Sequence, residues 1–318
     1  MPGPAGLVAG RAPRVLLAPG SSDFAADAVR QGGGQLVGEH DAVDALVWWD
    51  FEIDGLGQAV RAHPDVRWVQ LPMAGVDHVF QAGIFSGPQA NGIVWTCAKG
   101  SYAQPVAEHA LCLALAGLRK LPERARARSW GTPDGVSLYD RSVTILGGGG
   151  ITRELLALLA PFRVHATVVR KGMAPVEGAE RTVTTTDLHP ALASALVVFV
   201  ALALSPETEH IVGEPELAAM SEDAWLVNVA RGRHVDTGAL VKALREGWIG
   251  GAALDVTDPE PLPDGHPLWT MPNCLVTPHS ADTPEMCQPL LAERIQQNVQ
   301  RFGTGRPLLG TVDLAAGY

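Results

Sequence analysis

Residues 142–154 read Ser-Val-Thr-Ile-Leu-Gly-Gly-Gly-Gly-Ile-Thr-Arg-Glu, the most informative stretch of the chain. The apolar run 143–146 predicts a buried strand, which leads directly into four glycines. A helical pattern follows the glycines and is ended by Pro161. This order of strand, glycine turn and helix is typical of a parallel α/β unit.

The glycine turn has the spacing of a dinucleotide-binding loop. Gly147, Gly149 and Thr152 stand at the three glycine positions of the pattern G-x-G-x-x-G. The first glycine permits a tight turn, the second lets a pyrophosphate approach, and the helix start at Gly150 and Ile151 offers free N–H groups. The third glycine normally lets helix and strand pack closely, so we expect altered packing at Thr152. A plain glycine-rich turn is the alternative.

Apolar runs extend this pattern in both directions. They predict strands at 14–18, 45–49 and 66–71 before the turn, and at 164–169, 197–200, 225–229, 251–256 and 275–277 after it. Between the two series, residues 105–128 have an apolar face at helical spacing and predict one helix with a basic, solvated end. We therefore predict an α/β fold with two series of parallel units.

Composition excludes several classes of protein. Hydrophobic residues make up 47% and charged residues 18%, which excludes a disordered chain. The net charge of −10 has the wrong sign for nucleic-acid binding. The longest near-apolar run, 191–204, is shorter than the ~20 residues of a membrane span, and the first 20 residues do not read as a signal peptide. The four cysteines form no C-x-x-C pair, so we expect free thiols, no metal and a cytoplasmic protein.

Arg170 and Lys171 follow the first strand after the glycine turn. An enzyme that binds NAD usually has Asp or Glu there, which accepts hydrogen bonds from the ribose 2′-OH. Cationic side chains cannot accept such bonds, but they can pair with the 2′-phosphate of NADP. The sequence therefore predicts NADP(H) as the preferred cofactor, with NAD(H) possible. Two surface cations without a ligand are the alternative.

Three polar residues in the last third closely follow predicted strands: Arg231, Glu260 and His279. The carboxyl ends of strands are where open α/β sheets bind ligands. Each of these residues taken alone is more often structural. Their common placement makes all three candidates for one active site.

Together with further motifs, these residues resemble the D-isomer-specific 2-hydroxyacid dehydrogenase family over nearly the whole chain. The motifs are Ala74-Gly-Val-Asp77, Val106-Ala-Glu-His109, the glycine turn, Pro206-Glu-Thr208, Asn228-Val-Ala-Arg-Gly232, Ala253-Leu-Asp-Val256, Glu260-Pro-Leu262 and Thr277-Pro-His279. The subgroup that looks closest is the NADP-dependent glyoxylate/hydroxypyruvate reductases. The features that suggest it are Leu46-Val-Trp48, Arg170-Lys171 and the tail Val312–Tyr318.

The resemblance implies hydride transfer between a nicotinamide cofactor and a small 2-oxo acid, giving the D-2-hydroxy acid. Arg231 would bind the substrate carboxylate and 2-oxo group through its forked donors. His279 would protonate the carbonyl oxygen as the hydride arrives. Glu260 would orient the imidazolium and raise its pKa.

The resemblance also implies how the substrate is held. The backbone N–H groups of Ala74 and Gly75 would bind its carboxylate. Trp48 would form a wall of the substrate pocket, or else is an aromatic residue of the core. Met73 replaces a small residue common in the family, so we expect it to narrow the pocket.

Three further residues are expected around the cofactor. Val229 would line the nicotinamide ring, and Asp255 would receive the nicotinamide carboxamide. Ala203 stands where the family usually has proline, so we expect a looser cofactor loop there.

The family's fold implies two Rossmann-like domains with a cleft between them. A flavodoxin-like substrate domain would comprise residues 1–100 and 282–318, and an NAD(P)-binding Rossmann domain residues 101–281. The active site would lie in the cleft, which closes by a hinge. Family members are usually homodimers joined near 105–128, so the expected partners are a small 2-oxo acid and a second copy of the chain, whose active site Trp130 would approach.

Two other functions remain open on the sequence. One is a dinucleotide-binding regulatory protein of the same fold, like the C-terminal-binding-protein corepressors. The other is a dehydrogenase for a larger, specialised 2-oxo acid. Formate dehydrogenase uses Gln at the position of Glu260, which argues against that activity.

Overall fold

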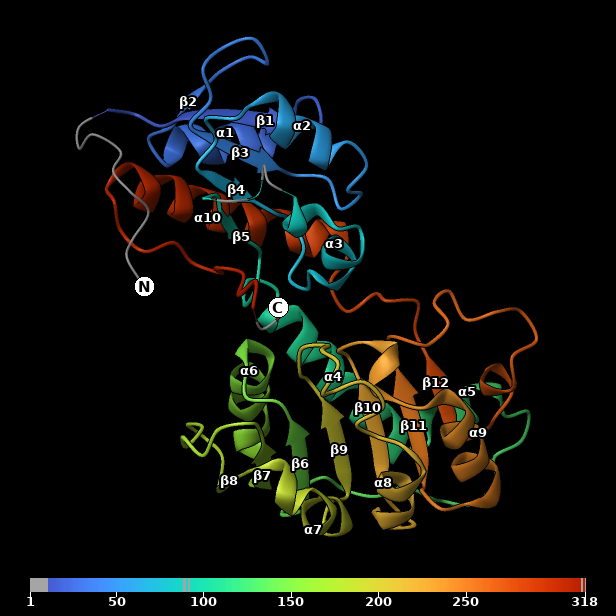
Figure 1. Cartoon of the computed structure of the whole chain (residues 1–318). Helices are drawn as coiled ribbons and strands as arrows, with labels where there is room; N and C mark the ends of the chain where they lie inside the picture. The colour runs from blue at the N-terminus through green and yellow to red at the C-terminus, as the bar shows by residue number, and fades with distance from the viewer. Residues whose placement is uncertain (1–10, 88–89, 91, 316, 318) are drawn as a thin grey trace. The chain divides into compact units, whose positions relative to one another are not determined.

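The computed structural model describes residues 11–87, 90, 92–315 and 317, so predictions that concern the first ten residues and Tyr318 lie outside it. The chain divides into two compact units. Unit 1 runs up to Tyr102 and resumes at Thr283, and unit 2 is Ala103–Asp282. Each unit has one parallel sheet with helices on its faces (Figure 1), which confirms the predicted α/β class.

The sheet of unit 1 has five parallel strands in the order β2-β1-β3-β4-β5. These are β1 (Arg14–Ala18), β2 (Gln35–Leu36), β3 (Ala45–Trp48), β4 (Trp68–Gln70) and β5 (Val94–Thr96). Successive side chains of a strand point to opposite faces. Val69 accordingly packs in a core cluster with residues of α2 (Leu56–Ala62) and α3 (Asp77–Gln81), whereas the ring of Trp68 lies 5.2 Å from that of Phe302.

Phe302 belongs to α10 (Pro284–Gly303), which packs beside α1 (Asp23–Gln31). The last helix of the chain therefore returns to complete unit 1. A short 3-10 helix, η1 (Ile84–Ser86), precedes β5.

The sheet of unit 2 has seven parallel strands in the order β12-β11-β10-β9-β6-β7-β8. They are β6 (Ser142–Leu146), β7 (His165–Val169), β8 (Arg181–Val183), β9 (Val197–Val200), β10 (Trp225–Asn228), β11 (Gly251–Leu254) and β12 (Cys274–Val276). The central strands are buried along their whole length, as expected for a parallel sheet covered on both faces.

Helices cover both faces of this sheet. One face carries α4 (Ala103–Leu118) and α6 (Gly150–Leu159), which pack against each other. The other carries α7 (Leu188–Ala193), α8 (Glu214–Ala219) and α9 (Thr237–Glu246). Short 3-10 helices complete the unit: η3 (Ala160–Phe162), η4 (Thr185–Asp187), η5 (Gly232–His234) and η6 (Pro267–Trp269).

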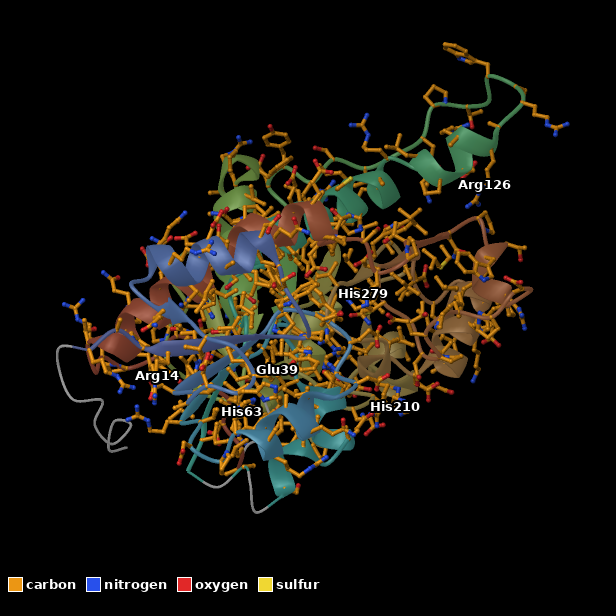
Figure 2. The ribbon with its side chains drawn as sticks, turned by 90° about the horizontal axis from the view of Figure 1, so that it is seen from above. Arg14, Glu39, His63, Arg126, His210 and His279 are labelled. Atoms are coloured by element: carbon orange, nitrogen blue, oxygen red, sulfur yellow. The ribbon has the colours of Figure 1, made fainter. Side chains whose placement is uncertain are left out.

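The prediction of a single helix over 105–128 is wrong. The structure has α4 and a separate helix, α5 (Leu121–Arg126), because Lys120 adopts a left-handed conformation with φ 55°. Pro122, at the start of α5, cannot continue a helix from the preceding turn. Figure 2 shows Arg126 on a segment that projects from the rest of unit 2, away from His279.

The order of strands in unit 2 fixes where a ligand can bind. β6 and β9 are neighbours in the sheet. The chain runs from β6 outward to β7 and β8 on one side, and from β9 outward to β10, β11 and β12 on the other. The boundary between β6 and β9 is therefore a topological switch point. The loops after their carboxyl ends diverge there and leave a crevice in sheets of this kind. The glycine turn follows β6 at this point.

Three features of the described residues bear on the general expectations. None of their helices combines the length and apolar character required to cross a membrane. No group of three His, Cys, Asp or Glu side chains is placed to hold a metal ion in this part of the chain. All four cysteines are free thiols; Cys112 is exposed, and Cys97, Cys274 and Cys287 are buried.

Candidate functional site

The glycine turn after β6 is shaped by close approach of the backbone. Gly147 has φ +111°, and a Cβ there would lie 2.3 Å from the carbonyl oxygen of Ala201, which follows β9. Only glycine fits this position. Gly149, at the N-cap of α6, faces open space, so a bound group can approach its backbone.

The start of α6 offers donors to such a group. The helix begins at Gly150, so the N–H groups of Gly150 and Ile151 have no acceptor in a preceding turn. These N–H groups and the positive end of the helix dipole suit a pyrophosphate. The residues present therefore fit a dinucleotide.

Thr152 does not disturb this turn, contrary to expectation. Its side chain is fully buried, and its hydroxyl donates to the carbonyl oxygen of Gly147 at 2.9 Å. The buried hydroxyl thus finds its acceptor within the turn. Threonine thus replaces the third glycine with an added hydrogen bond.

Arg170 and Lys171 follow β7 next to the glycine turn. A Cβ added at Gly148 would lie 3.1 Å from Cδ of Arg170, so this side chain borders the turn. The ammonium group of Lys171 lies 3.0 Å from a carboxylate oxygen of Glu207, in the loop after β9. Two cations therefore stand beside the candidate dinucleotide site, one of them paired with a carboxylate.

Arg231 lies on a tight turn after β10. The side chain of Asn228 holds this turn, because its amide donates to the carbonyl oxygen of Arg231 at 2.9 Å and its oxygen accepts from Ala230 N. Gly232 lets the turn contact the neighbouring loop, since a Cβ there would lie 1.9 Å from the carbonyl oxygen of Thr257. The sequence thus brings Arg231 beside the loop that carries Glu260.

Glu260 and His279 form a direct hydrogen bond. The Nδ1 of His279 lies 2.6 Å from Oε1 of Glu260, and both side chains are partly exposed. The carboxylate fixes the imidazole with its proton on Nδ1 towards Glu260, which leaves Nε2 for another partner. The backbone N–H of Thr257 donates to the other carboxylate oxygen at 3.4 Å.

The pKa values of His279 and Glu260 are shifted in opposite directions: that of His279 is raised and that of Glu260 is lowered. The hydrogen bond to Glu260 raises the pKa of His279, against the effects of burial and of the charge of Arg231. Burial acts to raise the pKa of Glu260, but the bond from His279 and the nearby cations bring it below its ordinary value. His279 can therefore act as a proton donor held by the carboxylate of Glu260, with Arg231 near both.

Asp255 fixes the backbone that carries His279. Its side chain is 1% exposed and accepts from Thr277 Oγ1 at 2.6 Å and from the N–H groups of Ser280 and Ala281 at 2.9 and 3.1 Å. Its carbonyl oxygen accepts from His279 N at 2.8 Å. His279 has φ +49°, a left-handed backbone conformation that residues other than glycine rarely adopt. The hydrogen bonds to Asp255 hold the backbone in this conformation.

This arrangement gives Asp255 a role in addition to the expected contact with the nicotinamide carboxamide, which stays a prediction. Burial acts to raise its pKa, but the hydrogen bonds it accepts, first that from His109, lower it to about 2. All its donors come from unit 2, and they occupy both carboxylate oxygens. The carboxylate therefore anchors the His279 loop.

His109 is a contributor that the sequence did not single out. From α4, its Nε2 lies 3.2 Å from Oδ1 of Asp255 and 3.1 Å from Oγ1 of Thr277. In the sequence it reads as one position of the apolar face of a helix. His109 also ends the motif Val106-Ala-Glu-His109, but neither the motif nor a polar residue on that face indicated the contact with Asp255.

The residues expected around the cofactor ring and loop are placed as follows. Val229 directly follows β10 and is buried. The carbonyl oxygen of Ala203 accepts a hydrogen bond from the hydroxyl of Thr208, which also accepts from Ser205 N, both at 2.8 Å. The loop with Ala203 in place of proline is therefore bridged by Thr208, and the expected loosening stays a prediction.

The remaining candidates lie in unit 1. Ala74 and Gly75 follow β4 in a partly exposed loop. Trp48 is 2% exposed, and its indole N–H donates to the carbonyl oxygen of Glu52, so it is a core aromatic in this structure. Met73 is also buried in the core of unit 1, which explains how the loop accommodates a large side chain.

Unit 2 therefore brings together the predicted triad of Arg231, Glu260 and His279. Figure 2 labels His279, which lies just beyond β12. The glycine turn, Arg170 and Val229 follow other strands of the same sheet at the same edge, because all seven strands are parallel. An acid, a carboxylate and a cation at the edge where a dinucleotide would bind can polarise and protonate a carbonyl group.

Comparisons with known proteins show the family of the chain. The model of the family described as D-isomer specific 2-hydroxyacid dehydrogenase, NAD binding domain, matches residues 109–281. A glyoxylate reductase of Aeropyrum pernix is 32% identical over 284 residues, which cover 84% of this chain and 81% of that protein. A Corynebacterium melassecola protein described only as uncharacterized is 38% identical over 299 residues, covering 92% and 95% of the two chains.

A solved structure agrees over almost the whole chain. The D-isomer specific 2-hydroxyacid dehydrogenase of Xanthobacter autotrophicus Py2, in complex with NADPH and MES, has a TM-score of 0.82 and 27% sequence identity. The match covers 97% of this chain and 100% of that one.

Proposed function

This chain belongs to the D-isomer specific 2-hydroxyacid dehydrogenase family, and on that premise we propose that it reduces a small 2-oxo acid of the glyoxylate or hydroxypyruvate type with NADPH. The product is the D-2-hydroxy acid. The observation that carries the proposal is the 2.6 Å hydrogen bond between His279 and Glu260 beside Arg231.

His279 is the acid of the proposed reaction. Its Nδ1 is held by Glu260, so the proton on Nε2 is available to the carbonyl oxygen of the substrate. The raised pKa of His279 favours the protonated form that reduction requires. In the reverse direction, the neutral imidazole accepts the proton of the hydroxyl group.

Arg231 provides the charge that binds and polarises the substrate. Its guanidinium can donate to the carboxylate and the 2-oxo group at the same time. The turn held by Asn228 and Gly232 keeps it beside Glu260 and His279. We propose that the N–H groups of Ala74 and Gly75 also bind the substrate carboxylate.

The glycine turn and the start of α6 would hold the pyrophosphate of the cofactor, and Arg170 and Lys171 its 2′-phosphate. The bound nicotinamide supplies the hydride. The absence of a carboxylate at the end of β7 supports NADPH over NADH, because the cations there attract a phosphate. Val229 would lie against the nicotinamide ring.

The direct test measures initial rates of absorbance loss with NADPH and with NADH against glyoxylate, hydroxypyruvate, pyruvate and phenylpyruvate. The proposal predicts the highest kcat/KM for a small acid with NADPH. Preference for phenylpyruvate would favour a larger specialised substrate. If the protein binds NADPH but reduces none of these acids, the proposal is contradicted. The alternative of a dinucleotide-binding regulatory protein would then be favoured.

A homodimer joined near α4 and α5 stays a prediction, as does a cytoplasmic location. Trp130 is 96% exposed and Leu121 is also exposed, which supports a contact with a second copy. The mass in solution tests this expectation.

A further inference from the structure

In the loop that follows β4, the carbonyl groups are hydrogen-bonded to other residues of unit 1. Four consecutive carbonyl oxygens, from Leu71 to Ala74, accept hydrogen bonds within unit 1. The pairs are Gln70 Nε2 to Leu71 O at 2.8 Å, Tyr102 Oη to Pro72 O at 2.5 Å, Ala98 N to Met73 O at 2.8 Å, and Cys97 Sγ to Ala74 O at 3.5 Å.

Because the peptide group is planar, the hydrogen bonds of these carbonyl groups also determine where the N–H groups of the loop point. In a trans peptide, the carbonyl of one residue and the N–H of the next point in opposite directions. The bound carbonyls of residues 72–74 therefore direct the N–H groups of Met73, Ala74 and Gly75 away from the anchoring segment. Within the described parts of the chain, no protein acceptor is recorded for these three N–H groups.

Two of the anchoring groups are side chains. The hydroxyl of Tyr102 orients the peptide that carries Met73 N, and the thiol of Cys97 orients the peptide that carries Gly75 N. Tyr102 is 3% and Cys97 1% exposed. Burial raises the pKa of the Cys97 thiol, so it keeps the proton that it donates.

The anchoring segment is itself fixed. Arg294 on α10 donates from Nη1 to the carbonyl oxygens of Cys97 and Lys99, at 3.0 and 3.1 Å. The N–H of Cys97 donates to Gly310 O at 2.8 Å. The loop is thus braced through residues 97–102 against the last helix and the chain beyond it.

We propose that Cys97 and Tyr102 are positioning residues, which aim the N–H groups of Met73, Ala74 and Gly75 at the carboxylate of the substrate. This inference rests on the proposed function and adds the residues that hold the loop. Neither side chain needs to touch the substrate. Three N–H groups that point away from the anchoring segment suit a carboxylate, because a hydrogen bond to a charged group is stronger than one between neutral groups.

The test uses Cys97→Ala, Cys97→Ser and Tyr102→Phe in the full chain. We would measure the Kd of oxamate for the NADPH complex, KM and kcat for the preferred 2-oxo acid, and the Kd of NADPH. Loss of one anchor is expected to raise the oxamate Kd and the KM about tenfold, equivalent to about 1.4 kcal/mol. We expect kcat to change much less.

Two controls separate positioning from general damage. Cys97→Ser keeps a hydrogen-bond donor and should restore most of the affinity lost in Cys97→Ala. The Kd of NADPH should be unchanged in all three variants, because the glycine turn lies in unit 2. Tyr102→Phe keeps the ring in the core and removes only the hydroxyl.

Unchanged oxamate affinity in both Cys97→Ala and Tyr102→Phe would overturn the inference. So would a serine variant as weak as the alanine variant, since volume rather than the donor would then matter. A wild-type protein that reduces no 2-oxo acid would instead overturn the proposed function. The oxamate affinities would still decide whether these residues orient a carboxylate-binding loop.

Discussion

Asp255→Asn should loosen the segment that carries His279. The asparagine side chain has the shape of the protonated carboxyl group, but it lacks the charge. Its NH2 group also replaces one of the two oxygens, so it faces either Ser280 N or Ala281 N, each a donor that needs an acceptor. The variant therefore weakens the bonds that keep His279 at φ +49°.

The lowered pKa of Asp255 sets the size of this effect. The pKa falls from 3.8 to about 2 in the folded chain, and at about 1.4 kcal/mol per unit this is worth about 2.5 kcal/mol. The sign follows from linkage: a carboxyl whose pKa is lowered by folding stabilises the fold above its unfolded pKa, and this contribution is lost as the pH falls towards 2. The Asp255→Asn variant would lack the contribution at every pH.

Hydrogen exchange followed by mass spectrometry can localise the loss. In peptides that cover β12 and residues 277–282, exchange at pH 7 should be up to about 60-fold faster in Asp255→Asn. Peptides of unit 1 should be unchanged. Thr277→Val is the matched control, because it removes one donor but keeps the charge, and it should cost only about 1 kcal/mol.

The same variant should lower kcat/KM by at least about tenfold, because the acid is no longer held. Wild-type exchange in the 277–282 peptides of Asp255→Asn, with normal turnover, would refute the idea that Asp255 fixes the His279 loop.

Three other predictions concern the site. In Glu260→Gln, the pKa of His279, the proposed acid, should fall because the hydrogen bond that raises it is weakened. Since kcat/KM for reduction is full below that pKa and lost above it, the decline should begin at a lower pH than in the wild type, and an unchanged pH profile would contradict this. Arg170→Asp should shift the kcat/KM ratio from NADPH towards NADH by about tenfold or more, and an unchanged ratio would place the 2′-phosphate elsewhere. Gly232→Ala should lower the free energy of unfolding by about 1–3 kcal/mol and abolish most of the activity, because its Cβ would collide with Thr257 O. In Gly57→Ala the added Cβ meets only the end of a flexible side chain, so thermal unfolding of this control should be nearly unchanged.

The sequence predicted the parts of the fold that carry a local signal. The strand 197–200 was predicted to the residue, because Val-Val-Phe-Val is buried on both faces. The short strands β2, β5 and β8 were missed, because two or three residues show no periodicity. β4 and β12 are equally short but were found, because predicted apolar runs overlap them. The break at Lys120 was missed although Pro122 offered the signal, because the apolar spacing continues through it.

The candidate site was predictable to a similar degree. Arg231, Glu260 and His279 were selected because each closely follows a predicted strand and because together they carry the family resemblance. Their common edge follows from the parallel sheet, whereas their catalytic roles stay a prediction. The anchoring role of Asp255 and its bond to His109 were not found, because they depend on how α4 packs on the sheet. The role of Thr152 was likewise invisible, since its acceptor is a backbone carbonyl within the turn.

The most direct test of the account compares the turnover of His279→Gln with that of the wild type, with NADPH and the preferred 2-oxo acid at saturation. Glutamine can still hydrogen-bond a carbonyl group but cannot protonate it. The account predicts that kcat falls by about 100-fold or more while the Kd of NADPH changes little. A variant with near-normal kcat would contradict the assignment of His279 as the acid.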